Sequence, residues 1–353
     1  MTRKNKIKIG HKFIGTDQPV FIIAEAGVNH NHRLDLALEL VDAAADVRAD
    51  AVKFQTFRAE QVVTEAGVMA EYQKKNIGKT ESQLDMLRKL EFSESWYPKV
   101  IAHCKKRGII FLSTPHGSFD SIDLLQKLGV PAFKFGSGDL TTLPILEYAA
   151  KLNKPIILGT GMATMAEVKE AVGAIKKAGN SQIVMLHCTT NYPCPPEEVN
   201  LRAMQTMMRE LDVLVGYSDH TLGSQVPVMA VTLDACVIEK HLTLDNDLPG
   251  PDHKASANPT VFKKMVDEIR QIETIMGSPI KRPLPGEVKL QSVVRRSIVV
   301  IRDIKRRDKF SRQNIDLKRP GTGLEPKYFS KVIGKKAAKD IKSGVLLDRN
   351  FIS

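Results

Sequence analysis

The chain has little cysteine and no long apolar run, and each shortage excludes a class of protein. Only 4 of its 353 residues are cysteine, and no two of them form a Cys-x-x-Cys pair. A disulfide framework or a structural zinc cluster is therefore not expected. No apolar stretch approaches the roughly 20 residues of a membrane helix, and no signal-peptide core follows the basic N-terminus. We expect no contact with a membrane and a cytoplasmic location.

Most of the chain also lacks an excess of either charge. Residues 1–290 contain 35 Lys and Arg against 34 Asp and Glu, whereas residues 291–353 contain 17 against 6. A basic region of this kind is typical of a protein that binds nucleic acid or an anionic surface. It carries no recognised nucleic-acid motif and few aromatic side chains, so we expect no nucleic-acid partner.

Short apolar runs alternate with helical segments along the first 245 residues, which predicts a parallel sheet. Amphipathic helices are expected at Leu34–Val47 and Ala166–Ala178. Residues 25–30 read EAGVNH, not the GxGxxG of a doubly wound dinucleotide fold, so the alternation favours a (β/α)8 TIM barrel. The eight expected strands are Val20–Ala24, Ala51–Phe54, Ile109–Ser113, Ala132–Gly136, Pro155–Gly159, Ile183–His187, Val213–Tyr217 and Ala235–Lys240.

Three segments are expected along the chain. The barrel takes residues 1–276 and ends with a helix at Pro259–Met276. Residues 277–290 are rich in Pro and Gly and form a linker that cannot continue that helix. Residues 291–353 form a small β-rich domain with strands at Ser297–Ile301 and Val345–Leu347.

Two histidines at the ends of neighbouring strands point to a metal site. Barrel enzymes build their active sites where the strands end, and His220 and His241 end the last two strands. Their imidazoles are expected to converge on one divalent metal ion, with Glu25 and Glu239 nearby. Two protein ligands would leave coordination positions for water and a substrate oxygen, as a catalytic metal needs.

Five other strand-end residues suggest an anion pocket. Two lysines and three hydroxyl groups suit a phosphate or a carboxylate, although local ion pairs are the other use of such lysines. These residues are Lys53, Thr114, Lys134, Ser137 and Ser218. Phosphate and metal together suggest a small phosphorylated substrate.

Ten short motifs, in order along the chain, resemble those of the sialic acid synthase family. The last of them resembles the antifreeze-like (SAF) domain fused to those enzymes. The motifs are AEAGVNH at 24–30, VKFQ at 52–55, STP at 113–115, KFGSG at 134–138, GTGM at 159–162, HCT at 187–189, YSDH at 217–220, EKH at 239–241, GPDH at 250–253 and KRPGTG at 318–323.

The resemblance implies a condensation of phosphoenolpyruvate with an N-acetylmannosamine-type sugar and water, giving N-acetylneuraminate or a close relative plus phosphate. It implies Mn²⁺ or Mg²⁺ on His220 and His241, and Glu25 as the general base for water. The implied catalytic residues are Glu25, Glu239 and Asp252; those that bind phosphoenolpyruvate are Lys53, Thr114, Lys134, Ser137, Asn191 and Ser218; those that bind the sugar are Gln55, Asp139, Tyr192 and Arg319. Whether Thr190 or Asn191 contacts phosphoenolpyruvate is open.

The resemblance also implies a domain-swapped homodimer, in which Arg319 of one subunit reaches the sugar in the barrel of the other. Two residues depart from the family pattern. His32 occupies a position where Gly is usual, and Asp139 one where N-acetylneuraminate synthases often carry Glu. The second departure keeps open an N,N'-diacetyllegionaminate synthase that uses 2,4-diacetamido-2,4,6-trideoxymannose.

A Schiff-base aldolase is the more distant alternative. Lys53 or Lys134 would then act as the nucleophile. This alternative leaves the two strand-end histidines without a role.

Overall fold

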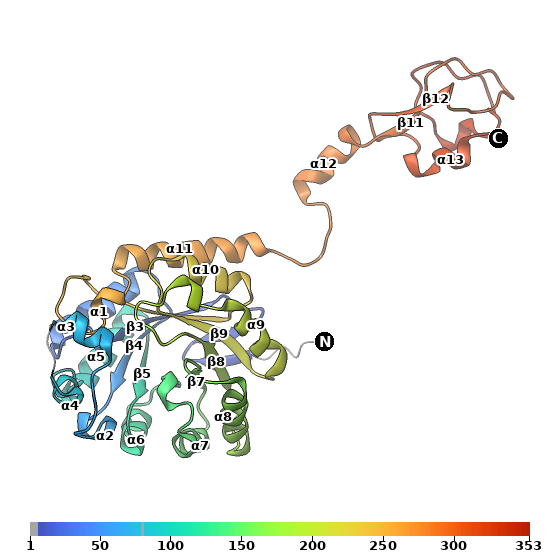
Figure 1. Cartoon of the computed structure of the whole chain (residues 1–353). Coiled ribbons are helices and arrows are strands. Elements are labelled where there is room, and N and C mark those ends of the chain that lie inside the picture. The colour runs from blue at the N-terminus through green and yellow to red at the C-terminus, as the bar shows by residue number, and fades with distance from the viewer. Residues whose placement is uncertain (1–5, 79–80) are drawn as a thin grey trace. The chain divides into compact units, whose positions relative to one another are not determined.

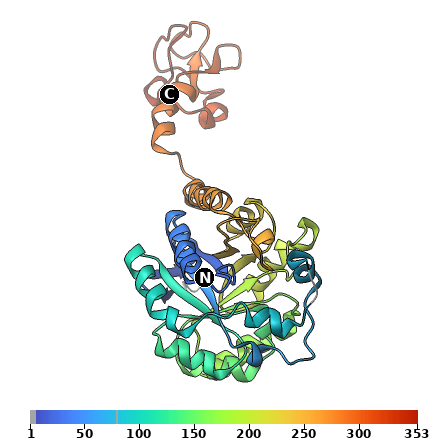
Figure 2. The ribbon, with the colours of Figure 1, turned by 90° about the vertical axis from the view of Figure 1, so that its left-hand side faces the viewer.

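The computed structural model describes residues 6–78 and 81–353, which divide into two compact units, Met1–Gly277 and Ser278–Ser353. In the first unit, helices surround a ring of parallel strands, so the predicted (β/α)8 barrel is confirmed (Figures 1 and 2). The strands are β3 (Phe21–Gly27), β4 (Ala51–Thr56), β5 (Ile110–Pro115), β6 (Phe133–Phe135), β7 (Ile156–Gly159), β8 (Ile183–His187), β9 (Leu214–Asp219) and β10 (Val237–His241).

The ring closes between its first and last strands. β10 pairs in parallel with β3, and the ladder runs β5-β4-β3-β10-β9-β8-β7-β6. β5 and β6, at the two ends of this ladder, lie side by side. The helices of this unit are α1 (Leu34–Asp46), α2 (Ala59–Val62), α3 (Glu71–Ile77), α4 (Gln83–Arg88), α5 (Tyr97–Arg107), α6 (Phe119–Lys127), α7 (Leu143–Lys151), α8 (Met165–Lys177), α9 (Leu201–Glu210), α10 (Gln225–Thr232) and α11 (Pro259–Met276).

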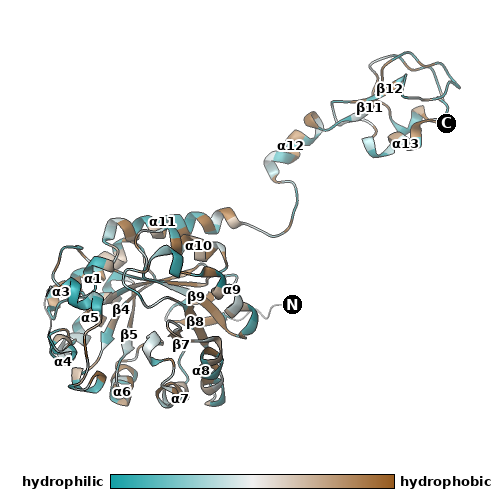
Figure 3. Ribbon diagram, viewed as in Figure 1, coloured by the Kyte–Doolittle hydropathy of each residue, from teal (hydrophilic) through white to brown (hydrophobic). Residues whose placement is uncertain are grey.

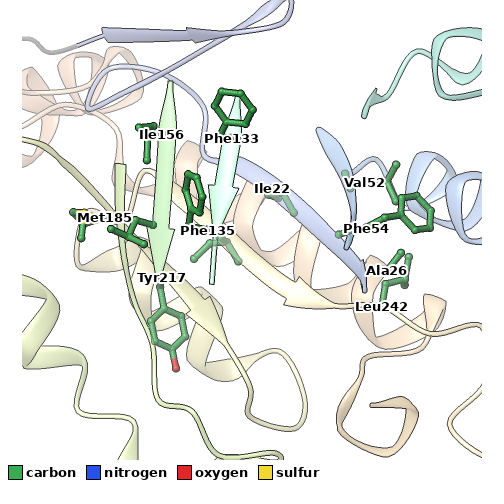
Figure 4. Packing of buried hydrophobic residues seen from close by; sticks show 14 of the residues in the cluster. Ile22, Ala26, Val52, Phe54, Phe133, Phe135, Ile156, Met185, Tyr217 and Leu242 are labelled. Carbon is green, nitrogen blue, oxygen red and sulfur yellow. The ribbon is translucent and has the colours of Figure 1, made fainter. Parts of the chain in front are cut away.

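The two-residue period of the strands separates an outer core from an inner one. Ile22 and Val52 face outwards and pack beneath the helices, as Figure 4 shows for several strands. Phe21 and Ile23 face inwards and belong to the apolar cluster inside the barrel, and the next inward residue along β3 is Glu25. The inner side therefore changes from apolar at the start of the strands to polar at their ends. In Figure 3 the barrel strands are mainly brown, whereas the helices around them mix brown and teal residues.

An N-terminal hairpin that the sequence analysis did not anticipate closes the bottom of the barrel. Its strands are β1 (Lys6–Ile9) and β2 (Lys12–Gly15), and Ile9 and Ile14 are fully buried in the inner cluster. The buried carboxylate of Asp50 pairs with Lys12 and also accepts a hydrogen bond from the Ile22 N–H at 2.8 Å. With this end sealed, the strand ends at the opposite face carry the open cavity.

The second unit contains a small antiparallel sheet, β11 (Ser297–Val300) and β12 (Ile315–Lys318), over its own apolar core. The strand expected at Val345–Leu347 is wrong: only an isolated bridge joins Leu346 to Val299. Helix α12 (Pro285–Val294) begins inside the expected linker because Pro285 takes the first helical position, where a missing N–H has no cost. The last α-helix of this unit is α13 (Phe329–Val332).

In the described part of the chain, no helix combines the length and apolar character needed to cross a membrane.

Candidate active site

A cavity opens at the carboxyl ends of the barrel strands, and most of the predicted site residues line it. They come from β3, β4, β5, β6, β9 and β10 and from the loops that follow β6, β8, β9 and β10. The predicted residues that line the cavity are Glu25, Lys53, Gln55, Thr114, Lys134, Ser137, Tyr192, Ser218, His220, Glu239, His241 and Asp252.

Two carboxylates and two ammonium groups form a buried network at the base of the cavity. Lys53 Nζ lies 2.6 Å from Glu25 Oε2 and 3.8 Å from Glu239 Oε2, and Lys134 Nζ lies 3.1 Å from Glu239 Oε1. Each of these side chains is at most 6% exposed. Lys53 also donates to the Thr114 hydroxyl at 3.0 Å, and the Ser218 hydroxyl donates to Glu239 at 3.1 Å. The charges balance, which makes their burial tolerable.

This network fixes the protonation of Glu239 and Lys134. Burial alone would raise the pKa of Glu239, but Lys134 and Lys53 outweigh burial and hold it at about 2. Burial alone would lower the pKa of Lys134, but Glu239 and Glu25 reverse this and raise it above its ordinary value. Lys134 is therefore an ammonium ion at neutral pH. A Schiff-base aldolase needs a neutral amine, so this geometry disfavours Lys134 in that role.

Glu25 differs from Glu239 in its electrostatic balance. Burial raises the pKa of Glu25 above its ordinary value, although the contact with Lys53 opposes the rise. Its Oε1 accepts a hydrogen bond from the Gln55 amide at 3.2 Å. A buried carboxylate with a raised pKa, held on both oxygens, is suited to proton transfer.

Asp252 provides a third buried carboxyl group at the cavity. Burial, with a smaller contribution from Glu25, raises the pKa of Asp252 to about 7. The loop that carries Asp252 is tied to helix α3, because the Asn76 amide donates to the Pro251 carbonyl at 2.6 Å. This carboxyl group changes charge near neutral pH.

His220 and His241 lie together, as predicted, with ring centroids 5.6 Å apart. His220 Nδ1 donates to the Thr189 carbonyl at 2.6 Å, which leaves Nε2 with a free lone pair. His241 Nδ1 is buried and has no hydrogen-bond partner among the described residues. Burial is the main cause that lowers the pKa of both histidines, so both are neutral and in the form that binds metals.

This pair fits a metal site on the chemistry of its donors. Two neutral imidazoles, one oriented by a carbonyl and one with an unpaired buried nitrogen, are suitable ligands for a divalent ion. Among residues 6–78 and 81–353, no group of three or more His, Cys, Asp or Glu side chains comes close enough to hold a metal. The pair alone would leave the remaining positions to water and substrate.

An aromatic stack covers the histidines. The Tyr192 ring lies 4.0 Å from the His220 ring, and the Tyr72 ring stacks on Tyr192 at 5.0 Å. Sequence reasoning found Tyr192 but missed Tyr72, because Tyr72 belongs to α3, in an insertion between β4 and α5 that follows no strand-end rule.

The same insertion provides an apolar wall that sequence reasoning also missed. Its side chains form a small separate cluster with residues of the barrel rim, and part of this cluster borders the cavity. The residues that line the cavity here, hereafter the apolar wall, are Val28, Phe57, Val62, Met86, Leu87 and Leu90.

Three predicted site residues do not line the cavity. Asn191 is exposed, and its amide donates to Glu198 at 3.0 Å, whereas Thr190 lines the cavity in its place. The Asp139 carboxylate accepts a hydrogen bond from the Gly136 N–H at 3.1 Å and faces His116, which itself lines the cavity. Arg319 lies in the second unit, where it is exposed.

The fold and the cavity define a (β/α)8 barrel enzyme whose site combines balanced charges with two neutral imidazoles. Comparisons with known proteins agree with this class. A model of the NeuB family matches residues 40–281, and a model of the SAF domain matches residues 295–350. The chain therefore belongs to the NeuB family and carries a SAF domain, and it is a synthase that forms carbon–carbon bonds, as the sequence resemblance implies.

Three relatives illustrate this membership. The chain is 47% identical over 328 residues to the N,N'-diacetyllegionaminic acid synthase of Campylobacter jejuni, covering 92% of this chain and 98% of that protein. It is 45% identical over 344 residues to the enzyme of the same name from Legionella pneumophila, covering 96% of each. The crystal structure of the N-acetylneuraminic acid synthetase of Leptospira borgpetersenii superposes with a TM-score of 0.71 at 33% identity, covering 81% of this chain and 95% of that one.

The raised pKa of Asp252 makes a prediction about stability. Because this pKa is higher in the folded chain than in the unfolded one, the folded chain binds more protons between about pH 4 and about pH 7. The carboxyl group therefore lowers the free energy of unfolding as the pH rises through this window. Above about pH 8 the charged carboxylate lowers the free energy of unfolding by at most about 4 kcal/mol, and Asp252→Asn should remove this pH dependence.

The measurement is urea unfolding at several pH values, followed by the fluorescence of Trp96, the single tryptophan. Asp247→Asn, at an exposed position in the same loop, is the matched control and should change little. Parallel pH profiles for the wild-type protein and Asp252→Asn would contradict the assignment.

Proposed function

We propose that this enzyme condenses phosphoenolpyruvate with 2,4-diacetamido-2,4,6-trideoxymannose and water, giving N,N'-diacetyllegionaminate and phosphate. The observation that carries the choice of sugar is the apolar wall beside a charged cavity base. Two acetamido methyl groups and a C6 methyl group suit such a wall better than the hydroxyl groups of N-acetylmannosamine do. The similarity to two synthases with this product name supports the same choice.

Phosphoenolpyruvate suits the ammonium end of the cavity. Lys53 and Lys134 would hold its carboxylate and phosphate groups, with hydroxyl groups completing the acceptors. These hydroxyl groups belong to Thr114, Ser137, Thr190 and Ser218. We expect the Thr190 hydroxyl, and not the Asn191 amide, to contact phosphoenolpyruvate, because the Asn191 amide donates to Glu198.

The sugar is expected to be free rather than 6-phosphorylated. In the described part of the chain, Lys53 and Lys134 are the lysine or arginine side chains that line the cavity, and both are needed for phosphoenolpyruvate. A second phosphate group would lie against the apolar wall, where the described lining of the barrel offers no lysine or arginine beyond these two, at a large desolvation cost.

The chemistry assigns one proton transfer to Glu25. C3 of the enol attacks the aldehyde carbon of the open-chain sugar, and water then adds to the electron-poor C2 before phosphate leaves. Glu25 would take the proton of this water, because its pKa is raised and Gln55 and Lys53 fix its two oxygens. Glu239 stays ionised and keeps the two lysines in position.

His220 and His241 would hold the divalent metal ion, Mn²⁺ or Mg²⁺. When bound there, the ion supplies Lewis-acid polarisation of the sugar aldehyde oxygen. Tyr192, whose ring packs against that of His220, and Asp252 would orient the sugar beside the ion.

The protein is expected to act as a domain-swapped homodimer in the cytoplasm. Helix α12 exposes several large apolar side chains, among them Val288 at 54% and Val293 at 61%. Apolar side chains this exposed favour a surface that a second subunit covers. Arg319 of the partner subunit would then orient the sugar with a forked, permanently charged donor. The four cysteines are free, which fits a reducing compartment.

The substrate assignment is tested by phosphate release from phosphoenolpyruvate in the presence of Mn²⁺. The sugars compared are 2,4-diacetamido-2,4,6-trideoxymannose, N-acetylmannosamine and N-acetylmannosamine 6-phosphate. We expect kcat/KM for the first to exceed that for the second by about 10-fold or more, the usual value of one or two apolar contacts. Equal or higher activity with N-acetylmannosamine would overturn the choice of sugar. If none of the three sugars supports phosphate release, the proposed reaction itself is overturned.

The metal assignment is tested by His220→Ala and His241→Ala. Each should lower turnover by about 100-fold or more, because the aldehyde loses its polarisation. EDTA should have the same effect on the wild-type protein, reversed by Mn²⁺. His103→Ala, whose imidazole pairs with Asp42 on the outside of the barrel, is the matched control. Full activity in both site variants would refute the assignment.

The exchange of SAF domains is tested by mixing two inactive variants. Arg319→Ala keeps an intact barrel, and Glu25→Ala keeps an intact Arg319. Random reassociation should give mixed dimers with one complete site each, hence about a quarter of the wild-type activity. Mixed dimers that are verified by mass but remain inactive would show that Arg319 acts within its own subunit.

A further inference from the structure

His116 is a cavity residue to which neither the family motifs nor the sequence analysis gave a role. It directly follows β5, where its N–H donates to the Thr56 carbonyl at 2.9 Å and its carbonyl accepts from the Ser121 hydroxyl at 3.2 Å. By strand alternation, its side chain lies on the same side as that of Thr114, one step nearer to the mouth of the barrel. The imidazole thus lies above the proposed phosphoenolpyruvate site.

The His116 ring is fixed on several sides. Its Nδ1 lies 3.6 Å from Asp139 Oδ2, and the Phe57 ring meets it edge-on at 6.5 Å. A Cβ atom at Gly136 would come within 3.2 Å of His116 Cε1, so the ring lies against this glycine backbone. The Asp139 carboxylate is itself held by the Gly136 N–H. A ring held in this way presents one orientation to the cavity.

Its surroundings favour a neutral imidazole. Burial lowers the pKa of His116; Asp139 opposes the change, and Lys53 and Lys134 reinforce it. A neutral ring whose Nδ1 faces a carboxylate carries its proton on Nδ1. Nε2 then has a free lone pair, which is a hydrogen-bond acceptor.

His116 also lies across the barrel from the proposed metal ligands. β5 is the third strand of the ring and β9 the seventh, so His116 and His220 end opposite strands. If the sugar aldehyde lies at His220 and His241, the open chain extends across the cavity towards His116. The apolar wall reaches the same place, because Phe57 contacts the His116 ring.

We infer that His116, positioned by Asp139, is a specificity-determining residue that accepts a hydrogen bond from an N–H or O–H group at C4 or C5 of the sugar. The inference rests on the proposed function. Asp139 is a positioning residue here: it acts through His116 instead of touching the sugar. The pair selects amino sugars that place a donor beside an apolar substituent, because the His116 ring adjoins Phe57 of the apolar wall.

The test measures KM for each substrate separately in His116→Phe, His116→Gln and Asp139→Ala. His116→Phe keeps the aromatic ring but removes the acceptor, so KM for 2,4-diacetamido-2,4,6-trideoxymannose should rise about 10-fold or more while KM for phosphoenolpyruvate changes less than about 2-fold. His116→Gln restores an acceptor and should recover most of the loss. Asp139→Ala should give an intermediate rise in the KM of the sugar alone.

Two results would overturn the inference. A rise in KM for phosphoenolpyruvate without one for the sugar would assign His116 to the anion site, and unchanged KM for both would leave it no role in binding. Both results count against the inference only if the wild-type protein releases phosphate with a sugar. A wild-type protein that releases none would instead refute the proposed function. His103→Phe, on the outside of the barrel, controls for nonspecific effects of losing a histidine.

Discussion

The buried network of Glu25, Lys53, Lys134 and Glu239 constrains the rest of the site. Four ionised groups at most 6% exposed can exist in a barrel only if each has a partner, because an unpaired buried charge typically costs about 3–5 kcal/mol. The pairing therefore makes the burial of the four groups possible. It also leaves two ammonium groups that can attract an anion while the carboxylates keep them in position.

The network is buried because the barrel closes below it. Ile9 and Ile14 of the N-terminal hairpin fill the lower end, and the inward side chains change from apolar there to charged at the strand ends. Burial, together with the neighbouring charges, gives the three carboxyl groups different pKa values. It raises the pKa of Glu25 and Asp252, whereas the lysines overcome it at Glu239. Three carboxyl groups in one cavity thus differ in proton affinity through their neighbours alone.

Sequence reasoning found the parts of the site that follow a rule of topology. Strand ends converge in a barrel, so residues such as Lys53 and His241 could be placed together from eight apolar runs and the residues after them. Tyr72 and the apolar wall could not be placed, because no periodicity fixes how an insertion folds over a barrel mouth. Asp139 shows a different limit. The strand end of Asp139 follows from the sequence, but only side-chain geometry shows that its carboxylate faces His116 and accepts a hydrogen bond from the Gly136 N–H.

The cavity residues that the barrel topology places and those that it does not place differ in their proposed chemical roles. Under the proposed function, the parts fixed by the barrel would supply what a condensation with phosphoenolpyruvate needs whatever the sugar: an anion site, two imidazoles for a metal ion and a base for water. By the same proposal, the insertion and the pair of His116 and Asp139 would face the end of the sugar away from the reacting carbon. Changes there leave the charge network intact, so a barrel of this kind can change its sugar without rebuilding its chemistry. On this proposal, Phe57, His116 and their neighbours would determine the sugar preference of the chain more than its catalytic residues do.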